Sequence, residues 1–238
     1  QKKDIEGTIL IEGLPGVGQV GKLVAEHLIH ELGAVKIAEI YSIYFPPQVL
    51  LDGEGVSRLV SNELYRYGGD NPILFLVGDY QSTSGEGHYL LADEYLNIAE
   101  KLGVKRIYTL GGYGVGHLID EPRVLGAVNS PGLKEEVERA GAIFTREEPG
   151  GGIVGASGLL LGLGVFRGIE GICLMGETSG YLVDPKSAHS LITVLCRMTG
   201  IDVDTTTLQE RAGEMEQLVE RLRQMEERRN DEELSYIG

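Results

Sequence analysis

The chain has 238 residues, of which 42% are hydrophobic, enough for one large α/β domain or two small ones. Its formal net charge of −15 argues against nucleic acid and anionic membranes as partners, because Lys and Arg provide the contacts to phosphate groups. The two cysteines form no disulfide framework, and we recognise neither a signal peptide nor an apolar stretch of about 18 residues, so we expect a cytoplasmic protein.

Residues 8–40 predict a strand, a glycine-rich turn, a helix and a second strand. The run 8–11 is short, apolar and rich in β-branched residues, as in a buried strand. Apolar residues then recur at helical spacing until Gly33, and a second apolar run covers 35–40. This order is typical of a βαβ unit, the building block of parallel sheets.

The turn matches a dinucleotide motif, with Gly16, Gly18 and Gly21 in G-x-G-x-x-G spacing between a strand and a helix. It also approaches a phosphate loop, but Leu23 occupies the position where Ser or Thr must hold Mg²⁺, which argues against an NTPase. Two interpretations remain. The glycines are spacers that let helix and strand pack closely, which we favour, or they bind a phosphate at the helix start.

Residues 41–67 predict an antiparallel excursion from the parallel pattern. Two apolar runs, 48–51 and 56–60, flank a four-residue loop with two glycines, as in a β-hairpin. Aromatic side chains gather here: Tyr41, Tyr44, Phe45, Tyr65 and Tyr67. They fit either a curved sheet edge with half-buried rings or a subunit interface.

The middle of the chain alternates strands and helices. The pattern predicts strands at 73–77, 104–110, 123–128 and 142–145, and helices at 89–102 and 131–140. The loop 78–88 brings Asp79 and His88 to the carboxyl end of a strand, where α/β proteins bind ligands, but its serines lack nucleophile spacing. We therefore favour a polar loop that caps the next helix. His117 lies near Asp120 without regular ligand spacing, so we predict no metal site and no catalytic residue.

The third part predicts a buried glycine-rich helix at 153–166, a core strand at 171–175 and a capped helix at 185–199. Glu177 follows the strand and is a candidate ligand-binding acid, or alternatively a cap for a neighbouring turn. The elements together predict a three-layer α/β/α domain over 5–202, with a largely parallel sheet and the antiparallel hairpin excursion.

The C-terminal part differs in kind. Residues 205–228 predict an amphipathic helix in which Leu208, Met215 and Leu222 recur every seven residues. This spacing favours an assembly or docking seam, and the alternative is a helix folded back on its own domain. The polar tail 229–238 carries three candidate partner contacts, Leu234, Tyr236 and Ile237.

Four ordered stretches resemble motifs of the archaeal proteasome assembly chaperone family. They are the glycine-rich opening at 11–22 and the segments 109–113, 154–162 and 174–178, within a resemblance that spans 9–201. The resemblance implies a nucleoside-phosphorylase-like fold and help in proteasome assembly without nucleotide turnover or cofactor. It also implies a homo-oligomer, trimer to pentamer, whose C-terminal tails dock on proteasome α-subunits. Here Tyr236 stands third from the end rather than second, after Ser235, which argues against direct insertion into an α-ring pocket but not against tail docking.

A rival hypothesis of another class is a nucleotide- or nucleoside-binding enzyme. It would use the turn from Gly16 to Gly21 together with Asp79, His88 and Glu177. A third interpretation is an interaction protein that senses a small molecule through a vestigial pocket.

Overall fold

The computed structural model describes residues 8–68, 72–145, 152–215 and 217–218. The strands are β1 (Thr8–Glu12), β2 (Val35–Ile40), β3 (Val49–Leu51), β4 (Ser57–Leu59), β5 (Asn62–Tyr67), β6 (Ile73–Gly78), β7 (Val104–Gly114), β8 (Val124–Val128) and β9 (Glu170–Thr178). The α-helices are α1 (Val20–Leu32), α2 (Gly85–Lys101), α3 (Lys134–Ala140), α4 (Gly155–Phe166) and α5 (Pro185–Thr199). A further helix covers 206–215.

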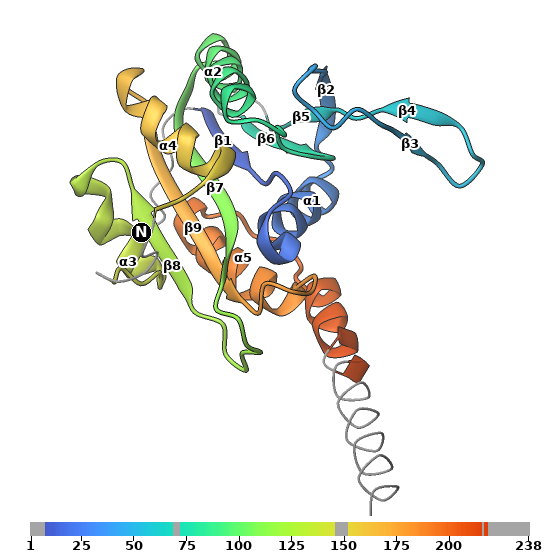
Figure 1. The fold of residues 1–238 in the computed structure, drawn as a ribbon. Coiled ribbons are helices and arrows are strands. Elements are labelled where there is room, and N and C mark those ends of the chain that lie inside the picture. Colours follow the sequence, from blue (N-terminus) through green and yellow to red (C-terminus); the bar gives the residue numbers. More distant parts are fainter. Residues whose placement is uncertain (1–7, 69–71, 146–151, 216, 219–238) are drawn as a thin grey trace, which may run out of the picture.

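A seven-stranded sheet forms the middle of the molecule, with the order β2-β5-β6-β1-β7-β9-β8 (Figure 1). β1 lies at its centre and pairs in parallel with both β6 and β7, and β7 pairs in parallel with β9. The edges are antiparallel, through β2 and β5 on one side and β8 on the other. All five residues of β1 are buried, as expected for a strand covered on both faces.

Helices cover both faces of this sheet. On one face, α1 and α5 pack in a core cluster that includes Ile9 and Ile11 of β1, and α3 contributes to the same cluster. On the other face, α2 and α4 pack in a second cluster that includes Leu10. Successive side chains of β1 therefore serve opposite layers. The predicted three-layer α/β architecture is confirmed.

Some predicted boundaries are wrong. α2 begins at Gly85, one turn before the predicted start, because the Ser84 hydroxyl accepts a hydrogen bond from the Gly87 amide at 3.1 Å and caps the helix. β7 continues to Gly114 alongside β9, beyond the apolar run that predicted it. In place of the predicted strand at 142–145, Ile143 forms an isolated bridge to Leu125.

The antiparallel excursion is an arm. We use this name for residues 41–60, which contain β3 and β4. These two strands form a separate two-stranded sheet that extends away from the main sheet beside β2 and β5 (Figure 1). The chain then returns to the main sheet as β5.

Candidate functional site

The glycine-rich turn after β1 is pressed against the carboxyl ends of β7 and β9. A Cβ atom at Gly21 would lie 2.1 Å from the carbonyl oxygen of Leu110, and one at Gly112 would lie 2.2 Å from that of Val17. Gly18 has φ +62°, and its missing Cβ would lie 2.8 Å from the Thr178 hydroxyl. The glycines thus allow backbones to approach where no side chain fits, which supports the packing interpretation.

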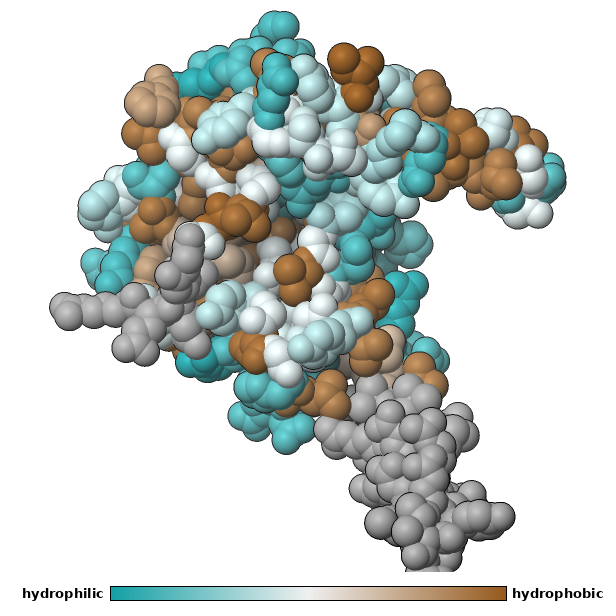
Figure 2. Space-filling view, in the orientation of Figure 1, coloured by the Kyte–Doolittle hydropathy of each residue, from teal (hydrophilic) through white to brown (hydrophobic). Residues whose placement is uncertain are grey.

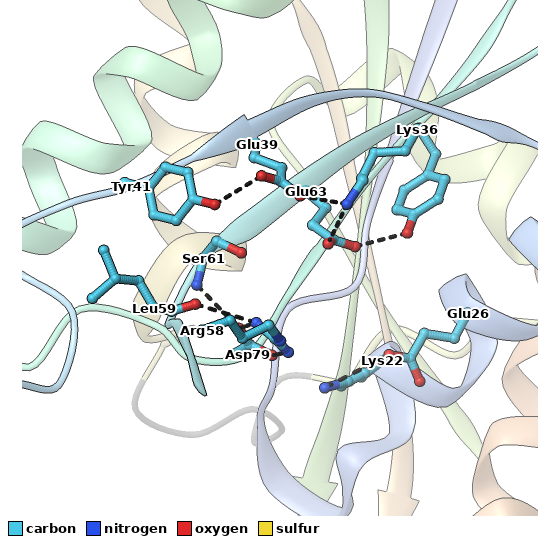
Figure 3. Close-up of polar contacts among 11 residues, drawn as sticks. Lys22, Glu26, Lys36, Glu39, Tyr41, Arg58, Leu59, Ser61, Glu63 and Asp79 are labelled. Atoms are coloured by element: carbon cyan, nitrogen blue, oxygen red, sulfur yellow. Dashed lines mark hydrogen bonds and ion pairs between the residues drawn. The ribbon is translucent and has the colours of Figure 1, made fainter. Parts of the chain in front are cut away.

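A groove of about 510 Å³ lies beside this turn. Gly16 and Asp79 both line it, together with Lys22 and Glu26, so the structure brings two of the candidate pocket residues together. Gly18 and Gly21 are not among its lining residues, because they face β7 and β9 instead. Lys22 lies 3.6 Å from the carboxylate of Glu26, within its own helix (Figure 3).

Asp79 anchors the arm rather than standing free for a ligand. Both of its oxygens accept hydrogen bonds from the guanidinium of Arg58, at 2.6 and 2.7 Å, and one also accepts from the Ser61 amide at 3.0 Å (Figure 3). The Arg58 contact is the main cause that lowers the pKa of Asp79 below its usual value. The ion pair between Asp79, which follows β6, and Arg58 of β4 therefore links the arm to the main sheet.

Glu177, at the carboxyl end of β9 on the other side of β1, also pairs with an arginine, Arg123. Its carboxylate accepts hydrogen bonds from the backbone amide of Arg123 at 3.0 Å and from the Arg123 guanidinium. These bonds to Arg123 lower the pKa of Glu177. A separate groove of about 560 Å³, shared with Tyr113 and His117, lies here. Glu177 fixes the chain that enters β8, as the capping interpretation expected.

His88 lies apart from both grooves. It sits half-buried in the first turn of α2, where its amide donates to the Ser84 carbonyl. The candidate pocket residues thus lie in three places: Gly16 with Asp79, Glu177 with Arg123, and His88 on α2. They form no single constellation that could share one nucleotide.

Glu12, which the sequence pattern did not single out, is a fully buried acid at the end of β1. One carboxylate oxygen accepts from the Leu14 amide at 2.9 Å, and the other accepts from the Ser157 hydroxyl of α4 at 2.8 Å. Burial outweighs both hydrogen bonds and raises the pKa of Glu12 to about 7. The signal available in the sequence was an acid between an apolar strand and a glycine turn.

Gln81 makes a second bridge between the same two segments. Its side-chain amide donates to the carbonyl of Pro15 at 2.8 Å, and its oxygen accepts from the Ala156 amide at 3.0 Å. Ala156 lies in the first turn of α4, where backbone amides have no acceptor within the helix. Gln81 satisfies one of them, so this helix start is used to hold the glycine turn in place.

The base of the arm is held by a polar network on β2 and β5. Lys36 contacts the carboxylates of Glu39 and Glu63, and its distance to Glu63 is 3.1 Å (Figure 3). The hydroxyl of Tyr41 donates to Glu39 at 2.7 Å, and that of Tyr65 donates to Glu63 at 2.7 Å. Two tyrosines of the aromatic cluster thus have defined partners within their own chain.

The C-terminal helix begins against the domain. Leu208 is only 1% exposed and belongs to the core cluster of α1 and α5, which is the folded-back arrangement. The His27 ring hydrogen-bonds the carbonyl of Asp204 at 2.7 Å, just before the helix. Met215 is half-buried. Leu222 and the tail residues Leu234, Tyr236 and Ile237 lie outside the described residues, so their roles stay predictions, as does the assembly seam.

Within the described ranges, no cluster of three or more His, Cys, Asp or Glu side chains is placed to hold a metal ion. The helices described for this chain include none with the length and apolar character needed to span a bilayer.

Solved structures match the fold over nearly the whole chain. Pyrococcus furiosus PbaB, described as an archaeal proteasome activator, has a TM-score of 0.86 and 41% identity, with 94% of this chain and 96% of that chain covered. Pyrococcus furiosus PbaA, described as an archaeal homolog of proteasome-assembly chaperone, has a TM-score of 0.77 and 32% identity, with 98% of this chain and 95% of that chain covered.

Sequence comparison agrees. The chain is 40% identical to the uncharacterized protein MJ1210 of Methanocaldococcus jannaschii, over 98% of this chain and 93% of MJ1210. The model of the PAC2 family matches residues 10–223, which include every strand and helix described above except the first residues of β1. From its sequence and its fold, the chain belongs to the PAC2 family.

Proposed function

We propose that this protein is a proteasome assembly chaperone homologue that binds α-subunits of the core particle and does so without turning over nucleotide. The observation that carries the proposal is the match, in both sequence and fold, over 94% and 98% of this chain to two proteins described as a proteasome activator and a homolog of a proteasome-assembly chaperone. The lack of nucleotide turnover is supported by the turn itself, where Thr178 and the Leu110 carbonyl occupy the space beside the glycines.

The C-terminal tail is the proposed contact with α-subunits. A short apolar segment after a charged linker gains modest affinity when it orders on a partner, and several copies in one assembly multiply that affinity. The acidic chain, at −15, would also attract basic partner surfaces over distances of about 10 Å at moderate salt.

The test is capture of proteasome α-subunits from the same organism by three tail variants. A chain ending at Glu233 and a full-length chain with Leu234, Tyr236 and Ile237 each changed to Ser should both lose capture. Ser235→Ala keeps the apolar residues and the length, so it is the matched control and should bind like the parent.

Each contrary result has a distinct meaning. Equal capture by the Glu233-terminated chain would remove the tail from the proposal while leaving the partner in place. Failure of the parent chain to bind any α-subunit or core particle would overturn the proposed function itself.

A further inference from the structure

Three loops meet at the carboxyl end of the sheet and turn apolar side chains to solvent. They are the glycine turn after β1, the loop 115–123 after β7 and the loop 179–184 after β9. Tyr181 is 79% exposed, and the other apolar side chains are between 42% and 46% exposed. Figure 2 shows hydrophobic residues at this end of the body, beside the place where the C-terminal helix leaves it. We call the five side chains the loop patch: Val17, Leu118, Tyr181, Leu182 and Val183.

The loop patch is one surface, although its members come from distant parts of the chain. A Cβ atom at Gly114 would lie 3.5 Å from the Val17 side chain, and one at Gly180 would lie 3.7 Å from it. A Cβ atom at Gly116 would lie 3.8 Å from the Tyr181 hydroxyl. The three loops therefore pack against one another.

Polar groups hold the loop 179–184 in place from below. The Asp184 amide donates to the carbonyl of Gly18 at 2.9 Å, and the Asp184 carboxylate accepts from the Ser187 amide at 2.9 Å and caps α5. The hydroxyl of Ser179, only 6% exposed, accepts from the Tyr181 amide at 3.4 Å. The loop thus buries polar side chains and exposes apolar ones. A patch fixed in this way loses little conformational entropy when it binds.

The shape of the loop patch fits a protein rather than a small molecule. Small molecules bind in concave sites, whereas Tyr181 protrudes into solvent. A groove adjoins each end of the patch. Val183 lines the groove of about 510 Å³, and both chain neighbours of Leu118, His117 and Ile119, line the groove of about 560 Å³. A protruding tyrosine with apolar neighbours and polar grooves around it is the usual anatomy of a protein–protein contact.

The C-terminal helix leaves the domain at the same end. The side-chain amide of Gln209 lies 2.9 Å from the ring of His189, which belongs to the first turns of α5, just after the loop 179–184. Figure 1 shows that this helix extends past the carboxyl ends of the strands, in the same direction as the loop 115–123. A protein bound to the tail is therefore held at the end of the molecule that carries the loop patch.

We propose that the loop patch is a second contact with the α-subunit that the tail captures, an inference that rests on the proposed function. The tail tethers the subunit, and the loop patch packs on an apolar area of the subunit's surface. Once the tail is bound, the second contact forms within one complex, so even a small apolar patch adds substantially to the affinity.

Charge indicates what borders that apolar area on the partner. Two exposed acids, Asp120 and Glu121, follow Leu118 in its loop, whereas Arg123 is bound to Glu177. A partner surface with Lys or Arg beside its apolar area complements these acids. A second copy of this chain would bring the same acids together, and each copy carries −15.

The first test measures the affinity of the full-length protein for a purified α-subunit by calorimetry. Tyr181→Ala combined with Leu182→Ala should weaken binding by about tenfold or more. Tyr89→Ala combined with Leu90→Ala removes the same two side-chain types from exposed positions of α2, on the other face of the sheet. This matched control should bind like the parent. Unaltered circular dichroism verifies that both variants are folded.

The second test identifies what lies against the patch. Photoreactive benzoylphenylalanine in place of Tyr181 should cross-link to the α-subunit on irradiation, whereas the same group in place of Tyr89 should not.

The contrary results separate this contact from the proposed function. Parent-like binding by the Tyr181 and Leu182 variant, while the tail variants still lose capture, would overturn the loop patch and leave the tail contact standing. A cross-link from position 181 to a second copy alone would overturn it as well. If the parent bound no α-subunit, the proposed function would fail first and this contact with it.

Discussion

At the residue scale, Glu12 shows how burial can outweigh hydrogen bonding. The carboxyl group has two donors, Leu14 and Ser157, and yet its pKa rises from 4.5 to about 7, because desolvation of the charged form is the larger effect. A raised folded-state pKa means that the folded protein binds this proton more tightly than the unfolded chain. The resulting stabilisation is complete below pH 4.5 and is lost as the pH rises to about 7.

We therefore expect Glu12→Gln to remove a pH dependence. The difference between 4.5 and about 7 corresponds to about 3 kcal/mol in the free energy of unfolding. Urea unfolding between pH 5 and pH 8 should show the parent losing stability relative to the variant, with the variant ahead at pH 8. Glu177→Gln is the contrasting control, because the pKa of Glu177 is lowered and its removal should cost stability at neutral pH. Parallel profiles for the parent and Glu12→Gln would refute this account.

At the scale of elements, the contact of α1 with β7 depends on the absence of a side chain at one position. Gly21→Ala would place a Cβ 2.1 Å from the Leu110 carbonyl, so helix and strand would have to separate. We expect a loss of about 1–3 kcal/mol or more, as for overpacked cores. The measurement is urea or thermal unfolding.

Gly162→Ala is the matched control for that prediction. Gly162 also lies in a helix, α4, but it is exposed, and no atom of a neighbouring element lies within 4 Å of the place that an alanine methyl group would occupy. Alanine should stabilise this helix by about 0.5–1 kcal/mol. Equal effects at the two positions would mean that helix propensity, and not close approach, explains the glycine at 21.

The sequence pattern predicted helices and strands well where apolar residues recur with the regular spacing of a helix or a strand. The strands and helix at 8–40, the hairpin and the helix at 185–199 all follow from apolar spacing and caps. The pairing within 8–40 does not follow, because β2 pairs antiparallel with β5 at the edge of the sheet and not with β1. The contacts that hold the glycine turn did not follow, because Glu12 and Ser157 are 145 residues apart and Gln81 and Ala156 are 75 apart. Spacing along the chain also could not show that the Asp79 carboxylate accepts hydrogen bonds from Arg58, because these residues meet only when the arm folds back on the domain.

On the scale of the whole molecule, the C-terminal helix is coupled to the domain at its first turn. Leu208→Ala should cost about 2–5 kcal/mol in the free energy of unfolding, as for other buried leucines, because Leu208 lies in the main core cluster. Leu218→Ala, at an exposed position beyond the helix 206–215, should change stability by less than about 0.5 kcal/mol. Thermal unfolding distinguishes the two. If neither variant were destabilised, the folded-back packing of the helix start would be wrong.

The central place of β1 in the sheet sets the order in which the chain can fold during synthesis. Both neighbours of β1 come much later in the sequence: β6 starts at Ile73 and β7 at Val104, and β7 in turn waits for β9 at Glu170. Such distant pairings are slow to form, and until they do the apolar strand has no partner. Residue 170 lies more than two thirds of the way along the 238-residue sequence, so most of this polypeptide must leave the ribosome before its first strand lies inside a finished sheet.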